Sequence, residues 1–254
     1  MSDGLCSVTA RAWTTPKPHA ESGKENEDRF WLSGYRTGEP LARPVYAAVA
    51  DGASGSLFSR EWASELVRLY GHSSSDETLW EQAARNWEER TSRKDLPWYL
   101  AAKKTEGAQA AFVGVTCQVN GTWGAVAAGD CCLIQRRDNQ LRTAFPLARA
   151  DDFSSMPALW ATNAQPAQNR AATHRTTGFW AAGDDLYLMT DALAAWCLRE
   201  IEAKRDPWVW LDGIASDKDF RQRVQILREN GRLRGDDTTV LHLRFADFPT
   251  ESTN

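Results

Sequence analysis

The segment Val45-Tyr46-Ala47-Ala48-Val49-Ala50-Asp51-Gly52-Ala53-Ser54-Gly55 decides the fold of this chain. Its apolar first half, bounded by Pro44, is typical of a buried strand. The strand leads Asp51 directly into a turn in which glycines permit close approach of the backbone. An isolated Asp-Gly pair is usually no more than the turn that ends a strand. Asp51 therefore becomes a functional candidate only if other acidic residues repeat its placement.

Acidic residues stand beside other apolar runs in the same way. Taken singly, each has a plain structural explanation, as a loop or turn residue or as the N-terminal cap of a helix. Because a strand with buried apolar flanks cannot readily bury an unpaired carboxylate, the shared placement predicts one convergent cluster. Such an oxygen-rich cluster suits Mg²⁺ or Mn²⁺. The residues are Asp28 before 29–32, Asp130 after 123–129, Asp191 after 186–190 and Asp236 before 238–243.

The motifs around these residues occur in the order found in the metal-dependent type-2C protein phosphatases, the PPM family. The chain resembles that family from about Ser7 to Phe245. Each motif is weak evidence alone, whereas five in the family's order are strong evidence. Glu25-Asn26-Glu27-Asp28 resembles the family's Asn-Glu-Asp motif, Asp51-Gly52-Ala53-Ser54-Gly55 its Asp-Gly-x-Gly-Gly, Gly129-Asp130-Cys131 its Gly-Asp-Ser, Thr190-Asp191-Ala192-Leu193 its Ser-Asp-Gly-Leu, and Asp236-Asp237-Thr238-Thr239-Val240 its Asp-Asn-x-Thr-Val.

Hydrophobic patterns predict alternating strands and helices. Asn120-Gly121 is a strong hairpin signal between two strands. Ser56 or Ser59 is a candidate cap for the first helix, and residues 146–178 lack a period and are predicted to form a long surface flap. The predicted strands are 5–15, 30–33, 45–50, 108–119, 122–135, one ending at 145, 186–189 and 238–245, and the predicted helices are 57–70, 77–89, 192–203 and one through 220–227.

Strands joined by hairpins, followed by pairs of helices, indicate helices packed outside antiparallel sheets. The resemblance sharpens this expectation to an α+β, four-layer α-β-β-α sandwich, with two central, mostly antiparallel sheets flanked by helices and a metal site at one edge. Residues 1–254 are expected to form a single phosphatase domain, with a core of about 7–245 and a flexible tail of 246–254.

The resemblance also implies a set of metal ligands. It implies two Mn²⁺ or Mg²⁺ ions and a third, weaker metal. Asp51 resembles the ligand that bridges the two central ions, and the carbonyl of Gly52 resembles a ligand of one of them. Asp191 and Asp236 resemble ligands of the other, so that Asp51, Asp191 and Asp236 are the expected catalytic residues. Among the remaining positions, Glu27 and Asp28 resemble the acidic pair that holds metal-bound waters, and Asp130 with Asp191 resembles the third site.

Some positions depart from the family's pattern. Gly23 stands where the family usually has an arginine that binds the substrate phosphate, and Lys24 is the nearest cation. Lysine is a point charge and cannot reproduce the bidentate geometry of arginine. Ala53 stands where some members have a histidine that protonates the leaving group, so no protein general acid is assigned. Gly107-Ala108-Gln109 departs from the family's Gly-Thr-Thr, and Ala192 replaces a glycine. Neither of these last two changes removes a ligand.

Composition narrows the class of protein. The net charge of −4 and pI near 5.7 give no basic footprint, which disfavours nucleic acid and anionic membrane as partners. No apolar run approaches the roughly 18 residues of a membrane span, and no secretory signal is visible. The five cysteines lack Cys-x-x-Cys spacing, which disfavours disulfides and zinc. We expect a cytoplasmic, monomeric enzyme.

These observations predict a stand-alone, bacterial-type serine/threonine phosphoprotein phosphatase that hydrolyses phosphate monoesters with a metal-activated water. The expected partner is a phosphoprotein, with a cognate serine/threonine kinase as a further candidate. The alternative is a catalytically weak member that serves as a phosphoprotein-binding or regulatory module, motivated by the missing arginine. A third hypothesis, hydrolysis of a small phosphoester, differs only in substrate. Turnover of a phosphothreonine peptide with Mn²⁺ and with chelator discriminates among them.

Overall fold

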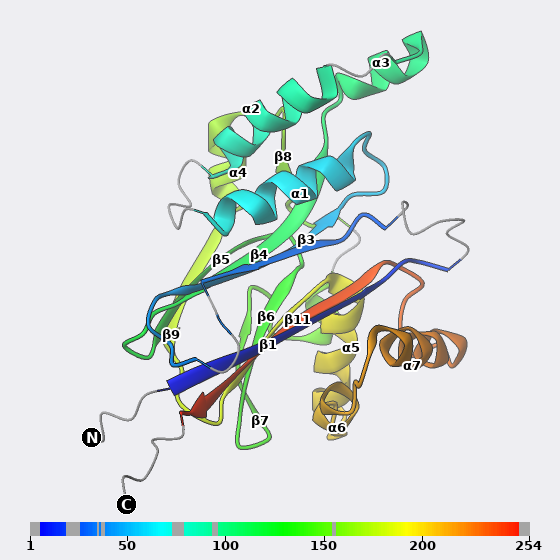
Figure 1. Cartoon of the computed structure of the whole chain (residues 1–254). Helices are drawn as coiled ribbons and strands as arrows, with labels where there is room; N and C mark the ends of the chain where they lie inside the picture. The colour runs from blue at the N-terminus through cyan, green and yellow to red at the C-terminus, as the bar shows by residue number, and fades with distance from the viewer. Residues whose placement is uncertain are drawn as a thin grey trace, which may run out of the picture.

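The computed structural model describes residues 6–18, 26–34, 36, 39–72, 79–92, 96–153 and 156–248. Its strands form two sheets in which every pairing is antiparallel (Figure 1). The five-stranded sheet has the order β1 (Cys6–Thr15), β11 (Thr238–Asp247), β10 (Asp185–Met189), β6 (Cys132–Arg137), β7 (Gln140–Phe145). The six-stranded sheet has the order β2 (Arg29–Ser33), β3 (Val45–Gly52), β4 (Gln109–Cys117), β5 (Thr122–Ala128), β9 (His174–Phe179), and the short β8 (Trp160–Ala161) pairs with β4.

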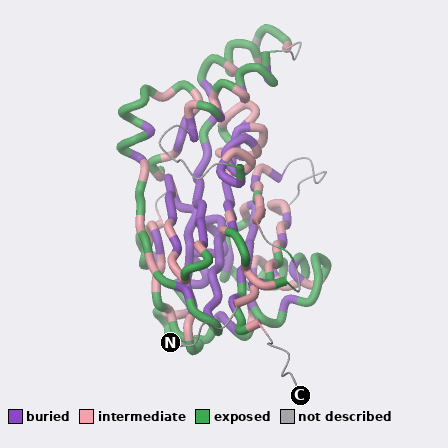
Figure 2. The backbone as a smooth tube through the Cα atoms, turned by 60° about the vertical axis from the view of Figure 1, so that its left-hand side comes forward, coloured by how far each residue is buried: buried purple, intermediate pink, exposed green. Residues whose placement is uncertain are grey.

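The alternation of side chains along a strand divides each sheet between two apolar layers. In β3, Val45, Ala47 and Val49 belong to the core between the sheets, whereas Ala48 and Ala50 belong to the core beneath the helices. Strand β10 does the same, with its even-numbered leucines facing the other sheet and Tyr187 and Met189 facing helices. Buried residues therefore fill the centre of the molecule (Figure 2).

Helices cover both outer faces. α1 (Ser59–Tyr70) packs on β3 and β4, and α2 (Leu79–Ser92) packs on α1. On the opposite side, α5 (Asp191–Glu202) packs on β6 and β11, and α7 (Asp217–Glu229) packs on β1. The predicted α-β-β-α sandwich is confirmed (Figure 1). The remaining short elements are α3 (Trp98–Lys104), η1 (Ala150–Asp152), α4 (Pro166–Ala171) and α6 (Trp208–Asp212).

The structure corrects several predictions about local elements. The predicted strand 122–135 is two strands, because the chain leaves the six-stranded sheet after Ala128 and enters the other sheet at Cys132. The segment 146–178 is not a structureless flap, since it contains η1, β8, α4 and most of β9. Neither Ser56 nor Ser59 caps α1: its N-cap is Phe58, with φ 61° and no side-chain cap. Helices α3 and α6 were not predicted.

Two sequence predictions concern the setting of the protein. The cysteines are free thiols, and all except Cys6 are buried. Within the described part of the chain, no helix is both long and apolar enough to cross a membrane.

Strand β11 continues to Asp247, beyond the predicted end of the core at 245.

Candidate metal centre

Asp51 is positioned by the alternation of β3. It continues the series Val45, Ala47, Val49, so its side chain lies on the face of β3 that meets the other sheet. Gly52 follows at the end of the strand, where a Cβ atom would lie 2.8 Å from the carbonyl carbon of Ser59. A larger residue there would push away the start of α1. The Asp-Gly pair thus places a carboxylate at the open edge of the sandwich beneath a helix.

Asp28 reaches the same edge from the start of β2. Its carboxylate is buried, and one oxygen accepts a hydrogen bond of 3.0 Å from the hydroxyl of Thr190. The other oxygen, Oδ1, has no hydrogen-bond partner among the described residues. Thr190 also accepts a bond from the backbone N–H of Thr239, which ties β10 to β11. Asp28 is therefore held in place while retaining an unused buried oxygen.

Asp130 lies in the turn that carries the chain from one sheet to the other. Gly129 has φ +77°, and a Cβ atom there would lie 2.8 Å from Cβ of Ala111 and 2.9 Å from Leu159. Only glycine combines that backbone conformation with so close an approach. Because Ala111 pairs with Asp51 across β3 and β4, the turn brings Asp130 beside Asp51. The predicted Gly-Asp motif thus has a structural cause.

Asp191 and Asp236 approach from the five-stranded sheet. Asp191 is the first residue of α5, where an acidic side chain is favoured by the helix dipole. Its Oδ1 accepts from the backbone N–H of Ala192 at 2.5 Å, and its Oδ2 accepts from Nη2 of Arg234 at 2.6 Å. Asp236 precedes β11, and its Oδ1 accepts from the backbone N–H of Asp237.

These elements enclose one acidic cavity of about 250 Å³ at the edge between the sheets. Four of the predicted carboxylates line it, together with a single cation, Arg234. Pro157 and Leu159, which follow η1, supply an apolar wall. The lining residues are Asp51, Gly52, Ala53, Ser54, Ala111, Asp130, Pro157, Leu159, Asp191, Arg234 and Asp236.

Burial and mutual repulsion favour the protonated form of several of these carboxyls. Burial, with the charges of Asp28 and Asp191, raises the pKa of Asp51 well above its ordinary value. Burial followed by nearby acids also raises the pKa of Asp28, whereas a hydrogen bond opposes the rise. The pKa of Asp130 rises to about 6 through burial and the charge of Asp191. The cluster is unfavourable without a compensating cation, which is the electrostatic character of a cation site.

A second layer of hydrogen bonds supports the acidic cavity. Glu27 accepts hydrogen bonds from Ser59 at 2.5 Å and Ser54 at 2.6 Å, and pairs with Lys17 at 3.1 Å. Asp237 accepts from the backbone N–H groups of Lys17 and Glu27, both at 2.7 Å. These bonds join the end of β1, the start of β2 and the loop before β11. They fix the segments that carry Asp28 and Asp236.

The donor set fits a hard divalent cation. Carboxylate and backbone oxygens are the preferred ligands of Mg²⁺ and Mn²⁺, and the unused Oδ1 of Asp28 is a free buried acceptor. Among the described residues, no three His, Cys, Asp or Glu side chains already stand together as a ready metal site.

The structure brings together most of the residues predicted from sequence. Asp51, Gly52, Asp130, Asp191 and Asp236 share the cavity. Asp28 is buried within electrostatic range of Asp51. Glu27 instead lines the adjacent cavity with Lys17 and Ser54. Lys24 lies outside the described residues, so its assignment to the substrate phosphate stays a prediction.

Sequence reasoning missed three residues of this region: Lys17, Arg234 and Asp237. Arg234 had the clearest signal, because it is a cation two positions before a predicted ligand. Asp237 stands where the PPM pattern has asparagine, yet it serves as an acceptor of two backbone bonds. Lys17 lies between two prolines, and its neighbours in the sequence give no signal of its contacts with Glu27 and Ser54.

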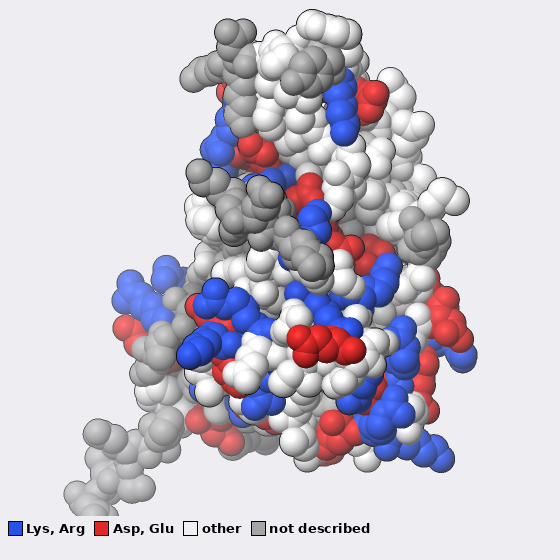
Figure 3. All heavy atoms as spheres, turned by 90° about the vertical axis from the view of Figure 1, so that its right-hand side faces the viewer, with Lys and Arg blue, Asp and Glu red and all other residues white. Residues whose placement is uncertain are grey.

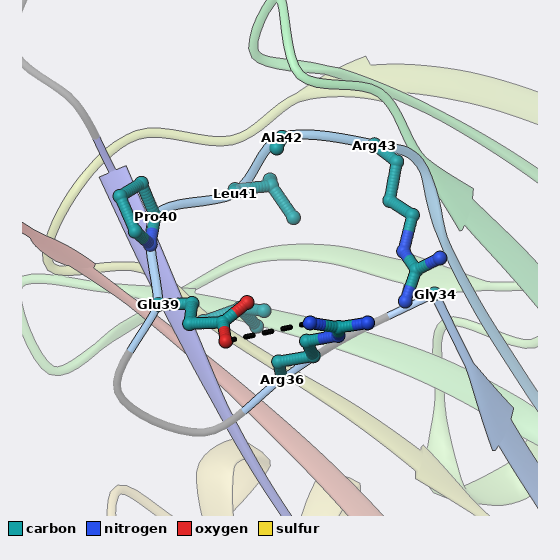
Figure 4. A pocket seen from close by; sticks show the side chains of 8 residues that line it. Gly34, Arg36, Glu39, Pro40, Leu41, Ala42 and Arg43 are labelled. Carbon is teal, nitrogen blue, oxygen red and sulfur yellow. Dashed lines mark ion pairs between the residues drawn. The ribbon is translucent and has the colours of Figure 1, made fainter.

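Other parts of the surface offer weaker sites. A cavity of about 260 Å³ lies beside β1, where the side chain of Arg36 points toward Glu39 and Arg43 lies on the far side of Arg36 (Figure 4). Arg36 and Glu39 are exposed and form an ion pair at 3.5 Å, so each charge already has a partner. The face turned forward in Figure 3 shows Lys and Arg interleaved with Asp and Glu over its lower half, without a large patch of one sign. Neither feature resembles a catalytic cavity.

Comparison with solved structures identifies the architecture. PppA from Pseudomonas aeruginosa, described as a key regulatory component of T6SS, is 14% identical with a TM-score of 0.60, covering 96% of this chain and 100% of that one. The chain has the fold of the PPM phosphatases. The catalytic domain of the serine/threonine phosphatase PstP, in complex with two manganese ions, is 15% identical with a TM-score of 0.56 and coverages of 95% and 100%.

A third similar solved structure is described by the name of the PPM family. The PPM Ser-Thr phosphatase MsPP from Mycobacterium smegmatis is 18% identical with a TM-score of 0.55, covering 94% of this chain and 99% of that one. At such identities the likeness is one of fold. Neither a sequence-family model nor a curated protein sequence matches this chain.

Proposed function

We propose that this protein is a PPM-type serine/threonine phosphoprotein phosphatase that hydrolyses phosphate monoesters with two bound Mn²⁺ or Mg²⁺ ions. The observation that carries the proposal is the convergence of Asp51, Asp130, Asp191 and Asp236 on one cavity at the edge of the sandwich. Their repulsion raises carboxyl pKa values in a way that a divalent cation would reverse. The PPM fold supports the same reaction class.

The proposed roles follow the positions of the side chains. Asp51 and the carbonyl of Gly52 would hold the central ions from β3, and Asp191 and Asp236 would hold them from the opposite sheet. Bound ions of this kind lower the pKa of a water and stabilise the charge that develops at phosphorus. The unused Oδ1 of Asp28 would accept a hydrogen bond from a water held at the ions. Asp130, beside Asp191, would serve a weaker cation.

Hydrogen bonds to neighbouring residues hold the segments that carry these ligands in place. Glu27 is fixed by Ser54 and Ser59, and Asp237 fixes the backbone at Glu27 and Lys17. The apolar wall from Pro157 and Leu159 excludes water from one side of the cavity.

The proposal includes a phosphoprotein substrate, an opposing kinase as a further partner, and a monomeric single domain working in the cytoplasm.

A second candidate is a phosphoprotein-binding or regulatory module with little turnover. The observation that favours it is the ion pair between Arg234 and Asp191, which engages a predicted ligand. The absence of a ready three-ligand group among the described residues points the same way. Retention of every predicted carboxylate favours the enzyme.

The deciding experiment is hydrolysis of a phosphothreonine peptide with Mn²⁺ and with EDTA, using Asp51→Ala as the background. We expect turnover only with metal and only in the parent. Binding of the phosphopeptide without turnover above that background would favour the regulatory module. Faster turnover of p-nitrophenyl phosphate than of any phosphopeptide would favour a small phosphoester as substrate.

A further inference from the structure

Arg234 is the single cation among the residues that line the acidic cavity. It lies in the loop between α7 and β11, and its side chain is 52% exposed. Its Nη2 donates to Oδ2 of Asp191 at 2.6 Å. The side chain is thus held at the cavity while remaining open to solvent.

The pairing with Asp191 leaves most of the guanidinium unused. A guanidinium carries five N–H donors in a fixed plane, and one of them serves Asp191. Within the described residues, Arg234 makes no other hydrogen bond to the protein. An arginine anchored by one carboxylate keeps its remaining donors in a fixed orientation, which is the arrangement that binds oxyanions in a bidentate manner.

The charge of the cavity creates a need for such a group. A phosphate ester carries negative charge, and the carboxylates around it would repel it. Arg234 is the only cation among the residues that line this cavity, where it accompanies four carboxylates. A fixed cation at this position offsets the repulsion felt by an incoming oxyanion.

Two other cations lie near the acidic cavity, and both already have partners. Nη2 of Arg228 donates to the backbone carbonyl of Asp236 and to the hydroxyl of Thr238. The second is Lys17. Nζ of Lys17 donates to Glu27 at 3.1 Å and to Ser54 at 3.0 Å. It lines the neighbouring cavity rather than the acidic one. Among these cations, Arg234 is the one that lines the acidic cavity.

We propose that Arg234, anchored on Asp191, binds the phosphate group of the substrate. This inference rests on the proposed function, because it assigns a substrate-binding residue to the same cavity. The arginine comes from the loop between α7 and β11. Its effect is on phosphate capture and not on metal retention.

The chain supplies a matched control two residues earlier. Arg232 is 47% exposed and donates to Glu200 of α5 at 2.5 Å, as Arg234 donates to Asp191 of the same helix. Arg232 does not line the acidic cavity. Replacing it removes an equal charge from the same loop without touching the proposed site.

The primary test is calorimetric titration of inorganic phosphate into the Mn²⁺-loaded protein. A charge-assisted hydrogen bond contributes about 1.5–3 kcal/mol, so Arg234→Ala should weaken phosphate binding roughly 10- to 100-fold. Arg234→Lys should fall between, because it keeps the charge without the planar donors. Arg232→Ala should match the parent. Equal phosphate affinity in the parent and Arg234→Ala, with both folded by thermal unfolding, would overturn the inference.

Titration of Mn²⁺ without phosphate separates this inference from the proposed function. Arg234→Ala should bind Mn²⁺ at least as tightly as the parent, because a competing cation has been removed from Asp191. If Arg234→Ala binds Mn²⁺ more tightly but phosphate equally well, Arg234 is only a counter-ion and the inference is wrong. If the parent binds no Mn²⁺ and hydrolyses no phosphopeptide, the proposed function itself fails, and the inference fails with it.

Discussion

The two ends of β10 bury acidic residues in opposite electrostatic settings. At its start, Asp185 is buried and accepts bonds from Arg136 at 2.6 and 2.9 Å, from Arg244 at 2.8 Å, and shares one of 2.6 Å with His242. Register explains this cluster, because Asp185 pairs directly with Arg136 on one side and Arg244 on the other. Although burial alone would raise the pKa of Asp185, these partners hold it well below its ordinary value.

Beyond the other end of β10, the acids have acids for neighbours. Asp28 and Asp51 are surrounded by carboxylates, and burial raises the pKa of each. Arg234 is the single cation among the residues that line the acidic cavity. The contrast shows that the sandwich buries paired, stabilising charges at one end of β10 and a cluster of repelling charges beyond the other end. Carboxylates retained without partners indicate a function that requires them.

The largest expected effect concerns the acidic end. Asp51→Ala and Asp236→Ala should each lower kcat/KM for a phosphothreonine peptide by at least ~10³-fold, since each removes a proposed ligand of the central ions. Both variants should remain folded, because neither carboxylate is in a stabilising ion pair in the structure. Asp217→Ala, at the exposed start of α7, is the control and should retain parental activity. Parental kcat/KM in Asp51→Ala would contradict the proposed site.

Breaking the opposite end should cost stability instead. Asp185→Ala leaves Arg136 buried without its main partner, and removal of one member of a buried ion pair costs about 3–5 kcal/mol. Urea unfolding monitored by tryptophan fluorescence measures the loss. Asp219→Ala, which removes a partly exposed pair with Arg223 and a bond from the backbone N–H of Ala215, should change the unfolding free energy less. A loss in Asp185→Ala no larger than in Asp219→Ala would erase the contrast between the ends.

The ends should also respond oppositely to pH in EDTA. The folded pKa of Asp130, about 6, exceeds its ordinary value of 3.8, so its contribution to stability is present below that value and is lost as pH rises through 6. The folded pKa of Asp185 is depressed, so its contribution is present above 3.8 and is lost as pH falls.

Urea unfolding from pH 4 to 7 tests this difference. The metal-free parent should lose up to about 3 kcal/mol relative to Asp130→Asn over that range, because about two pKa units separate the folded and unfolded states. If the unfolding free energies of the parent and Asp130→Asn depend on pH in the same way, the pKa of Asp130 is not raised in the folded protein.

Metal should relieve the acidic end. Mn²⁺ at about 100 times its Kd contributes roughly 2.7 kcal/mol, which corresponds to a rise in Tm of about 5–11 °C for a chain of this size. Asp51→Ala should melt at or above the metal-free parent, having lost a repelling charge, and should shift little with Mn²⁺. Differential scanning calorimetry with and without Mn²⁺ measures both. An equal shift in parent and variant would contradict the assignment of Asp51 as a central ligand.

Local patterns were sufficient for the elements that carry the site. The continuous apolar runs of β3 and β10, and the position of an acid beside each run, are properties of neighbouring residues. The order of the motifs then predicted the sandwich. Helix α1 was predicted, but not its N-cap, because Ser59 bonds to Glu27, which is distant in sequence.

By itself, the sequence determined the apolar runs that form most of the strands, the four longest helices, and which carboxylates stand at strand ends, because these follow from patterns over a few residues. Only the tertiary structure decided that the chain changes sheets at Gly129, that Arg234 pairs with Asp191, and that Asp185 is neutralised by Arg136 and Arg244. Those outcomes depend on strand register and on the approach of loops distant in sequence. A local pattern contains no information about either, since many registers satisfy the same alternation.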